Sequence, residues 1–296
     1  MTIPKKTIIV TGGAGFVGSN LISLLIIKTN FKIISIDNYT TGTKKNHIKN
    51  NRINYINGNT KNIFQLLKDP KKIHSIFHFG EFARIYQSFL KMNDCIDSNS
   101  IGSNAVFNFC LKNKIKLIYS ATSATLGNNG VDKNLSPYAF TKAKNLELLE
   151  NLKKWFNFKF EIIYFYNVYG PNQIKKGHMS TVIGIFENLY KLKKTLTIVR
   201  PGSQCRRFTH VSDTVEICYL AWKKNLNRHY SISNKKSYSI VDVAKMFKGK
   251  VKFLPPRKGE RYASALISKN LSNKVHKYFG KINLKDYISN FLLKNS

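Results

Sequence analysis

The chain has 296 residues, 43% of them apolar, which is enough to bury a full core in one large domain or two. No apolar run reaches the roughly 20 residues of a membrane span, and a glycine-rich stretch stands where a signal peptide would have its hydrophobic region, so we expect neither membrane partner nor signal peptide. The net charge is +34, and its Lys and Arg residues are scattered along the chain. The sequence has no arginine-rich block, RNP motif or zinc finger, which disfavours a dedicated nucleic-acid partner. The excess positive charge should still attract anionic substrates.

The first predicted element is a strand that runs into a glycine turn and then a helix. The β-branched run at 8–10 is followed by Gly12-x-x-Gly15-x-x-Gly18, and a helical apolar face begins at Leu21. Glycines permit a tight turn, and the free N–H groups at a helix N-terminus attract a diphosphate. The order of strand, turn and helix therefore predicts a dinucleotide-binding fold.

A second strand, 33–36, ends in Asp37, about 20 residues past the glycine turn. In a dinucleotide-binding fold a carboxylate at this point contacts the ribose hydroxyls of adenosine. It would also repel a 2′-phosphate, so Asp37 favours NAD over NADP. The alternative is that Asp37 only begins a turn with Asn38.

The first 165 residues alternate short apolar strands with amphipathic segments. The expected strands are Thr7–Val10, Lys32–Ile36, Ile53–Ile56, Ser75–Phe79, Lys116–Ser120 and Phe160–Phe165. The expected helices are Ser98–Lys112 and Tyr138–Phe156, then Thr181–Leu192, Asp213–Lys224, Ile240–Phe247 and two more after Ser268. This alternation predicts an α/β fold with a Rossmann-like, doubly wound parallel sheet. We expect a cofactor domain at 1–166 and a smaller α/β substrate-binding domain at 167–296, with some segments of the second returning to the first.

Tyr138 and Lys142 follow Ser136-Pro137 at the start of the expected helix Tyr138–Phe156. Residues four apart share a helix face, and an ammonium beside a tyrosine favours the phenolate. The pair is therefore a candidate proton-transfer group for a sugar hydroxyl. A surface Tyr–Lys pair is the alternative, which the preceding glycine turn and Asp37 disfavour.

These motifs together resemble the NAD-dependent epimerase/dehydratase family of the extended short-chain dehydrogenase/reductase superfamily. The similarity continues through most of the chain, in 118–127, Gly58-Asn59, 78–81, the Asn99-x-x-Gly102-x-Asn104 segment, 164–171, 206–213 and 257–260. It implies a catalytic set of Thr122, Tyr138 and Lys142. The implied NAD-binding residues are Gly12, Gly15, Phe16, Val17, Gly18, Asp37, Asn38, Asn59, Thr60, Phe79, Gly80, Asn99, Tyr138, Lys142 and Phe165. The implied substrate-binding residues are Thr122, Asn167, Arg206, Arg257 and Glu260, with the two arginines on the substrate diphosphate.

The chain departs from the family pattern at several of these positions. Ser123 and Ala124 replace the Asp-Glu pair of the dehydratases, which disfavours a 4,6-dehydratase. Asn59 replaces an Asp, Tyr164 and Arg207 replace an Arg and an Asp, and Leu126 replaces an aromatic residue before Gly127. His210 is expected to be a core residue and not a catalyst.

The resemblance is closest to the 4-epimerases of UDP-glucose type, which implies a UDP-hexose substrate, a 4-keto intermediate and a homodimer using 98–112 and 138–156. A nucleotide-sugar reductase or decarboxylase is an alternative. A non-catalytic Rossmann protein that binds cofactor or RNA is a more distant one. The four cysteines have no metal-ligand spacing, so we expect no metal and a cytoplasmic location.

Overall fold

In the computed structural model, which describes residues 6–259 and 275–295, eight parallel strands form one sheet. Its order is β14-β11-β6-β5-β4-β1-β2-β3. The strands are β1 (Thr7–Thr11), β2 (Lys32–Asp37), β3 (Ile53–Asn57), β4 (Ile73–His78), β5 (Lys116–Thr122), β6 (Phe160–Phe165), β11 (His229–Ser233) and β14 (Val275–Phe279). The order 3-2-1-4-5-6 within it confirms the predicted doubly wound sheet.

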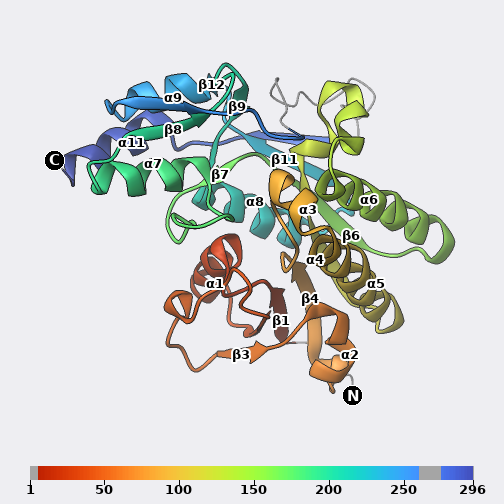
Figure 1. Ribbon diagram of the computed structural model, residues 1–296. Helices are drawn as coiled ribbons and strands as arrows, with labels where there is room; N and C mark the ends of the chain where they lie inside the picture. Colours follow the sequence, from red (N-terminus) through yellow and green to blue (C-terminus); the bar gives the residue numbers. More distant parts are fainter. Residues whose placement is uncertain (1–5, 260–274, 296) are drawn as a thin grey trace.

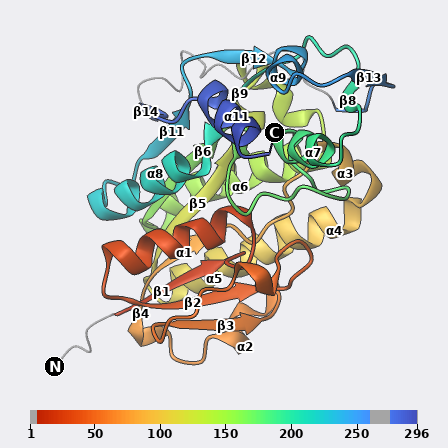
Figure 2. The same cartoon turned by 90° about the vertical axis from the view of Figure 1, so that its left-hand side faces the viewer.

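Helices cover both faces of this sheet (Figures 1 and 2). Helix α1 (Phe16–Lys28) packs beside α8 (Val211–Lys224) on one face. The other face carries α5 (Ser103–Lys112) and α6 (Pro137–Phe156). Shorter helical segments accompany these, namely α2 (Ile63–Leu66), α3 (Ile85–Leu90), α4 (Met92–Ile96) and the π-helical η4 (Asp97–Gly102). Strands buried on both sides explain the continuous apolar runs in the sequence.

A smaller unit sits at one end of the sheet, where Figures 1 and 2 show α7, α9, α11 and β8 together. Its core contains Phe186, Ile198, Phe247 and Leu284, all almost completely buried. Its elements are α7 (Val182–Lys191), α9 (Ile240–Met246) and α11 (Leu284–Leu293), the parallel pair β8 (Leu196–Val199) and β13 (Val251–Leu254), and the antiparallel pair β9 (Cys205–Arg207) and β12 (Ser237–Ser239). A two-residue pair, β7 (Val168–Tyr169) with β10 (Thr209–His210), leads into it.

The remaining regular segments are single 3₁₀ turns or short runs of them. They are η1 (Lys44–Asn46), η2 (Thr60–Asn62), η3 (Pro70–Lys72), η5 (Ser123–Thr125) and η6 (Asn128–Asn134). Among the described residues, no helix combines the length and the apolar character that crossing a bilayer requires.

The structure differs from the expected elements mainly in the second half of the chain. Strands β11 and β14 extend the large sheet beyond β6, and α8 covers part of its face. The helix expected from Ser98 starts as the π-helical η4 and becomes regular only at Ser103. Of the two helices expected after Ser268, α11 lies within the described residues, whereas 260–274 lie outside them.

Candidate active site

A cavity of about 490 Å³ opens at the carboxyl ends of β1 and β4, which lie side by side in the sheet. The helices that follow these two strands, α1 and α5, lie on opposite faces, so the strand order reverses here. Ligands of doubly wound sheets bind at such a point. The volume is in the range of small-molecule and cofactor sites.

The glycine turn after β1 forms the floor of this cavity. Gly12 has a φ of +69°, and a Cβ on it would lie 2.8 Å from the Gly80 backbone nitrogen. A Cβ on Gly18 would lie 2.1 Å from the Gly12 carbonyl oxygen. The helix α1 that follows has no side-chain cap at its N-terminus. Its first N–H groups are thus available to an anion, as a dinucleotide diphosphate requires.

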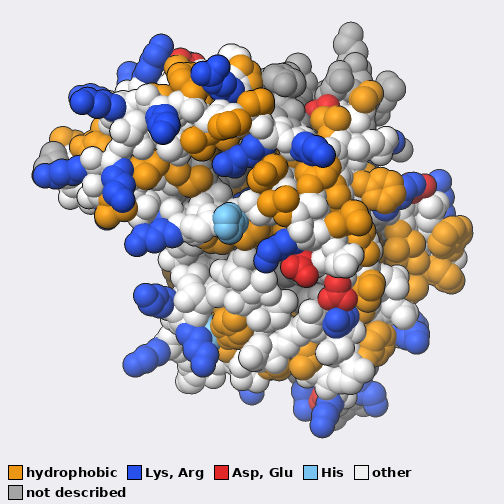
Figure 3. Space-filling view, in the orientation of Figure 1, with side chains coloured by type: hydrophobic (Ala, Val, Ile, Leu, Met, Phe, Trp, Pro, Cys, Tyr) orange, Lys and Arg blue, Asp and Glu red, His pale blue; other side chains and the backbone are white. Residues whose placement is uncertain are grey.

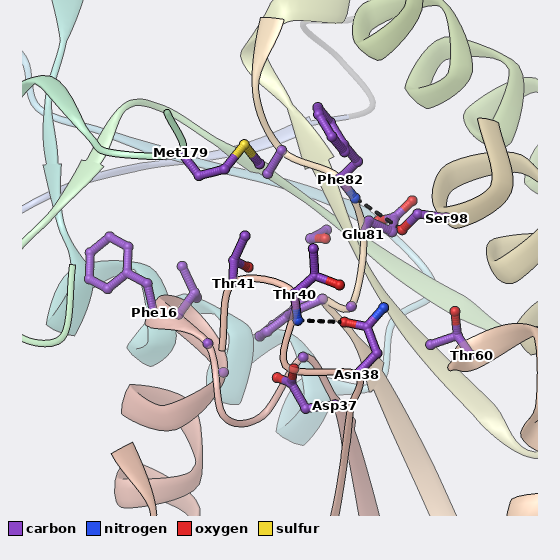
Figure 4. Close-up of a pocket in the computed structure, with 18 of the residues that line it drawn as sticks. Phe16, Asp37, Asn38, Thr40, Thr41, Thr60, Glu81, Phe82, Ser98 and Met179 are labelled. Carbon is purple, nitrogen blue, oxygen red and sulfur yellow. Dashed lines mark hydrogen bonds between the residues drawn. The ribbon is translucent and has the colours of Figure 1, made fainter. Parts of the chain in front are cut away.

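Asp37 lies at the end of β2, beside the glycine turn (Figure 4). Its carboxylate accepts hydrogen bonds from the Ala14 and Tyr39 backbone nitrogens at 3.0 and 2.9 Å. Burial raises the pKa of Asp37, although these backbone hydrogen bonds act in the opposite direction. The carboxylate lines the cavity and so lies within the place expected for the adenosine ribose.

Most residues that the resemblance assigned to NAD line this one cavity. They are Gly12, Gly15, Phe16, Val17, Gly18, Asp37, Asn38, Asn59, Thr60, Phe79, Gly80, Tyr138, Lys142 and Phe165. Asn99 is the exception, because its side chain is completely buried and points to the backbone of Phe82. Its Oδ1 accepts a hydrogen bond from the Phe82 N–H, and its Nδ2 donates one to the Phe82 carbonyl oxygen. Asn99 therefore shapes the cavity wall from behind without lining it.

Helix α6 positions Tyr138 and Lys142. Pro137 occupies its first turn, and the Ser136 hydroxyl accepts a hydrogen bond from the Ala139 nitrogen at 3.1 Å, which fixes where the helix begins. Tyr138 and Lys142 then face the carboxyl end of β5, and both line the cofactor cavity. The Lys142 side chain is only 4% exposed, and its ammonium donates to the Ser120 carbonyl oxygen.

A second cavity of about 430 Å³ adjoins the first and shares Tyr138 and Phe165 with it. Thr122, Asn167, Arg206 and Arg257 line this second cavity. Arg206 is held on β9 and is 7% exposed, whereas the Arg257 guanidinium lies 5.1 Å from the centre of the Tyr86 ring. Glu260 lies outside the described residues.

Thr122 ends β5 at the border of the two cavities. Its hydroxyl oxygen accepts a hydrogen bond from the Ala124 nitrogen at 3.2 Å, which caps the short turn η5. The hydroxyl proton remains available for another acceptor. Among the described residues that line the second cavity there is no Asp or Glu, so it lacks the carboxylates of the dehydratase segment.

The structure shows the contacts of Tyr164, Arg207 and His210, three positions that the sequence singles out. Tyr164 is 2% exposed and its hydroxyl lies 3.2 Å from His229 Nδ1, so it fills the core at a position where the family usually has Arg. The backbone carbonyl of Arg207 accepts a hydrogen bond from the Asn167 side chain at 3.0 Å. His210 caps α8 through its ring nitrogen, and burial lowers its pKa, in agreement with a core role.

Two charged residues that motif reasoning left without a role lie in the site. Arg84 lines both cavities, and its Nε donates to the Met179 carbonyl oxygen at 2.9 Å. Glu81, labelled in Figure 4, lines the first cavity and forms an ion pair with Lys142. Glu81 stands next to the 78–80 motif in sequence, but its partner is 61 positions away, which no local pattern reveals.

A buried hydrogen-bond chain leads from the glycine turn to Glu81. The Thr11 hydroxyl accepts from the Phe79 and Gly80 nitrogens and lies 2.7 Å from His78 Nδ1. His78 Nε2 lies 3.0 Å from the Ser103 hydroxyl, which donates to Glu81 Oε1 at 2.8 Å. Since the Ser103 proton goes to Glu81, neutral His78 carries its proton on Nε2 and accepts from Thr11. Complete burial lowers the pKa of His78 to about 4, which keeps it neutral.

The sequence profile of the NAD-dependent epimerase/dehydratase family matches residues 8–233. The chain belongs to this family. The family name gives the cofactor as NAD, and the uncapped helix, the glycine cradle and Asp37 fit that dinucleotide. Its relatives are enzymes that act on nucleotide sugars, which places the chain in that class of enzyme. The fold and the lining of the two cavities agree with this class.

Individual family members differ in what they act on. A Methanocaldococcus jannaschii protein with the provisional name UDP-glucose 4-epimerase is 29% identical over 86% of this chain and 88% of its own. A UDP-N-acetyl-alpha-D-glucosaminuronate decarboxylase of Bacillus cytotoxicus is 27% identical over 81% and 78%. The crystal structure of UDP-glucuronic acid 4-epimerase from Bacillus cereus, with UDP-glucuronic acid and NAD, superposes with a TM-score of 0.83 at 25% identity, covering 97% of this chain and 99% of that one.

Proposed function

We propose that the chain is a 4-epimerase of UDP-hexoses, with UDP-glucose and UDP-galactose as the expected pair. The observation that carries the proposal is the position of Tyr138 on the wall between two cavities. The first fits NAD, and the second has Arg206 and Arg257 for a diphosphate and Thr122 beside Tyr138. A sugar in the second cavity would have its reacting carbon close to both the tyrosine and the cofactor.

In this proposal Tyr138 acts as the general base that accepts the proton of the C4 hydroxyl and later returns it. Thr122 donates a hydrogen bond to the C4 oxygen and orients it. The Lys142 ammonium favours the phenolate of Tyr138 electrostatically. Bound NAD supplies the capacity to accept a hydride from C4 and give it back. The second cavity, at about 430 Å³, leaves space for the keto sugar to turn between the two transfers.

Ser123 and Ala124 support an epimerase over a dehydratase. A 4,6-dehydratase must add and remove protons at C5 and C6, which the side chains of serine and alanine cannot do at neutral pH. An epimerase needs only the C4 proton and hydride, so Tyr138 and Thr122 suffice.

A second candidate, a 4-epimerase or decarboxylase of a UDP-hexuronate, is favoured by Arg84. The second cavity contains three arginines, and two suffice for a diphosphate. Arg84 lies at the junction with the first cavity, close enough to Tyr138 for their charges to interact. A guanidinium at that end of the cavity would pair well with a sugar carboxylate.

The test is to incubate the purified protein with UDP-galactose and no added cofactor, following UDP-glucose by chromatography and absorbance at 340 nm together. Conversion without a lasting change at 340 nm supports a 4-epimerase that carries its own NAD. A net change at 340 nm indicates a one-way reaction. UDP-glucuronate and UDP-N-acetylglucosamine in parallel distinguish the second candidate, and a Tyr138→Phe variant is the control for chemistry at this site.

We also propose a homodimer and a cytoplasmic location. Large apolar side chains are exposed on α3, α4, η4 and α6, with Leu90 64%, Met92 54%, Ile101 54% and Phe140 45% exposed. Exposed apolar side chains of this size favour burial against a second copy. Figure 3 shows Lys and Arg spread over one face of the molecule without a single dense stripe.

Four free cysteines, three of them buried, agree with a reducing compartment.

A further inference from the structure

Glu81 is a buried carboxylate in the cofactor cavity to which the proposed mechanism gives no task. Its side chain is 2% exposed and pairs with the Lys142 ammonium. Three groups donate to its Oε1: the Ser103 hydroxyl at 2.8 Å, the Tyr119 hydroxyl at 3.0 Å and the Asn145 amide at 3.3 Å. These donors and the ammonium meet the hydrogen-bonding needs of a carboxylate that is buried from water.

The contacts of Lys142 show what this carboxylate does. The ammonium has three protons, and in the structure it donates to Glu81 and to the Ser120 carbonyl, with the Ser120 hydroxyl at 3.5 Å. It also lies 4.7 Å from the centre of the Tyr119 ring. These contacts fix a long, flexible side chain in one position at the end of β5.

We propose that Glu81 is a positioning residue of the Tyr138–Lys142 pair: its buried carboxylate holds the Lys142 ammonium in place and offsets its charge toward Tyr138. The proposal rests on the proposed function, because it concerns the same proton-transfer pair. The proposal goes beyond that function because it names the residue, Glu81, that controls how strongly Lys142 favours the phenolate of Tyr138. The Thr11–His78–Ser103 chain connects that control to the glycine turn of the cofactor cavity.

The other titratable groups around the pair do not compete in the neutral range. Burial lowers the pKa of His78 to about 4 and raises that of Cys95 to about 11. Burial also raises the pKa of Tyr119 well above its usual value. Arg84, whose charge interacts with Tyr138, stays protonated. These groups therefore do not account for a change in the tyrosinate signal in the neutral range.

The test compares Glu81→Gln with a matched control, Glu161→Gln. Glu161 is also fully buried and pairs with a lysine, Lys116, at 2.7 Å, but it lines neither cavity. Each protein is saturated with NAD⁺ and titrated by tyrosinate absorbance near 295 nm, and the same titration of its Tyr138→Phe counterpart is subtracted. The titration needs no turnover, so it tests the role of Glu81 even if the protein acts on no UDP-sugar. Absence of activity on every UDP-sugar would refute the proposed function alone.

We expect the Tyr138 signal to appear at a pH lower by about half a unit or more in Glu81→Gln, since one nearby unit charge is removed from a mostly buried site. In Glu161→Gln it should not move. An unchanged signal in Glu81→Gln overturns the proposal. An equal shift in both variants overturns it too, because general loosening would then be the cause.

If Glu81→Gln alone does not fold, the test uses Lys142→Met and the double variant. The double variant should melt at a higher temperature than Lys142→Met, whose buried carboxylate has lost its partner. A double variant that is no more stable than Lys142→Met contradicts the proposed pairing.

Discussion

Replacing Gly18 by alanine provides a direct test of the glycine cradle. The new Cβ would lie 2.1 Å from the Gly12 carbonyl oxygen and 2.8 Å from both the Gly12 carbonyl carbon and Gly13 Cα. Ordinary contact begins at 3.4 Å, so the closest approach is 1.3 Å too short (3.4 − 2.1). All three neighbours are backbone atoms, and none can rotate away. Either the first turn of α1 or the glycine turn must therefore move by about an ångström.

Two effects on stability oppose each other in this variant. Alanine inside a helix is favoured over glycine by about 1 kcal/mol, whereas overpacking of this kind costs about 1–3 kcal/mol. We therefore expect a modest fall in the free energy of unfolding, of about 0–2 kcal/mol. NAD binding should suffer more, because a displacement of about 1 Å misplaces the N–H groups that face the diphosphate. Losing one hydrogen bond to a charged group costs about 1.5–3 kcal/mol, which is a roughly ten- to hundredfold loss of affinity.

Gly15→Ala is the matched comparison. Its Cβ would meet the Gly12 oxygen at 3.1 Å, with the next atom at 4.0 Å, and its backbone φ of −81° suits any residue. Calorimetric titration of the NAD-free proteins with NAD⁺, together with thermal unfolding, should give a much larger loss of affinity for Gly18→Ala than for Gly15→Ala. Wild-type affinity in Gly18→Ala would refute the cradle geometry.

Three further predictions concern other parts of the molecule. Arg206→Ala should raise the KM for a UDP-sugar at least about tenfold, with a smaller effect on kcat. Arg206→Lys should restore little of this loss, because a lysine ammonium cannot donate to two diphosphate oxygens as a guanidinium does. Equal kinetics in the wild type and both variants would exclude Arg206 from the substrate site. Iodoacetamide at pH 8 should modify Cys205 first, since burial raises the pKa of Cys95 to about 11 and those of Cys110 and Cys218 further; mass mapping that finds Cys110 labelled first would contradict the buried core. His78 is neutral in the folded state down to about pH 4 but takes up a proton near pH 6.5 when the chain is unfolded. The free energy of unfolding should therefore fall by up to about 3 kcal/mol between pH 6.5 and 4, with no further loss from this group below pH 4. If a His78→Gln variant shows the same acid dependence in chemical denaturation, another group is responsible.

Short-range patterns in the sequence are sufficient for the dinucleotide-binding half of the molecule. The spacing of Gly12, Gly15 and Gly18 predicts the turn, and at Gly12 and Gly18 only glycine can accept such close backbone approach. Asp37 and the Tyr138–Lys142 pair are recognisable because each depends on one strand end or one helical turn. The doubly wound sheet follows from the alternation of apolar strands and helices, and the structure confirms it.

Patterns of this kind do not reveal contacts between distant segments. Strand β11 alternates polar and apolar residues, and β14, at the edge of the sheet, has exposed polar residues. Both lack the continuous apolar run that marked β1. Asn99 matches a family segment next to the active site, yet its amide turns toward the backbone of Phe82. Local sequence cannot distinguish these two orientations, because the chain around Asn99 is helical in either case.

The sequence by itself determined the fold class, the cofactor cradle and the candidate proton-transfer pair, since each arises from residues within a few positions of one another. Only the tertiary structure decided which charges meet. Glu81 and Lys142 are 61 positions apart and come together because β4 ends and α6 begins at the same edge of the sheet. Arg84 reaches Met179, 95 positions later, above the same edge. Charge pairing depends on distance in space and on burial, which the order of residues along the chain does not specify.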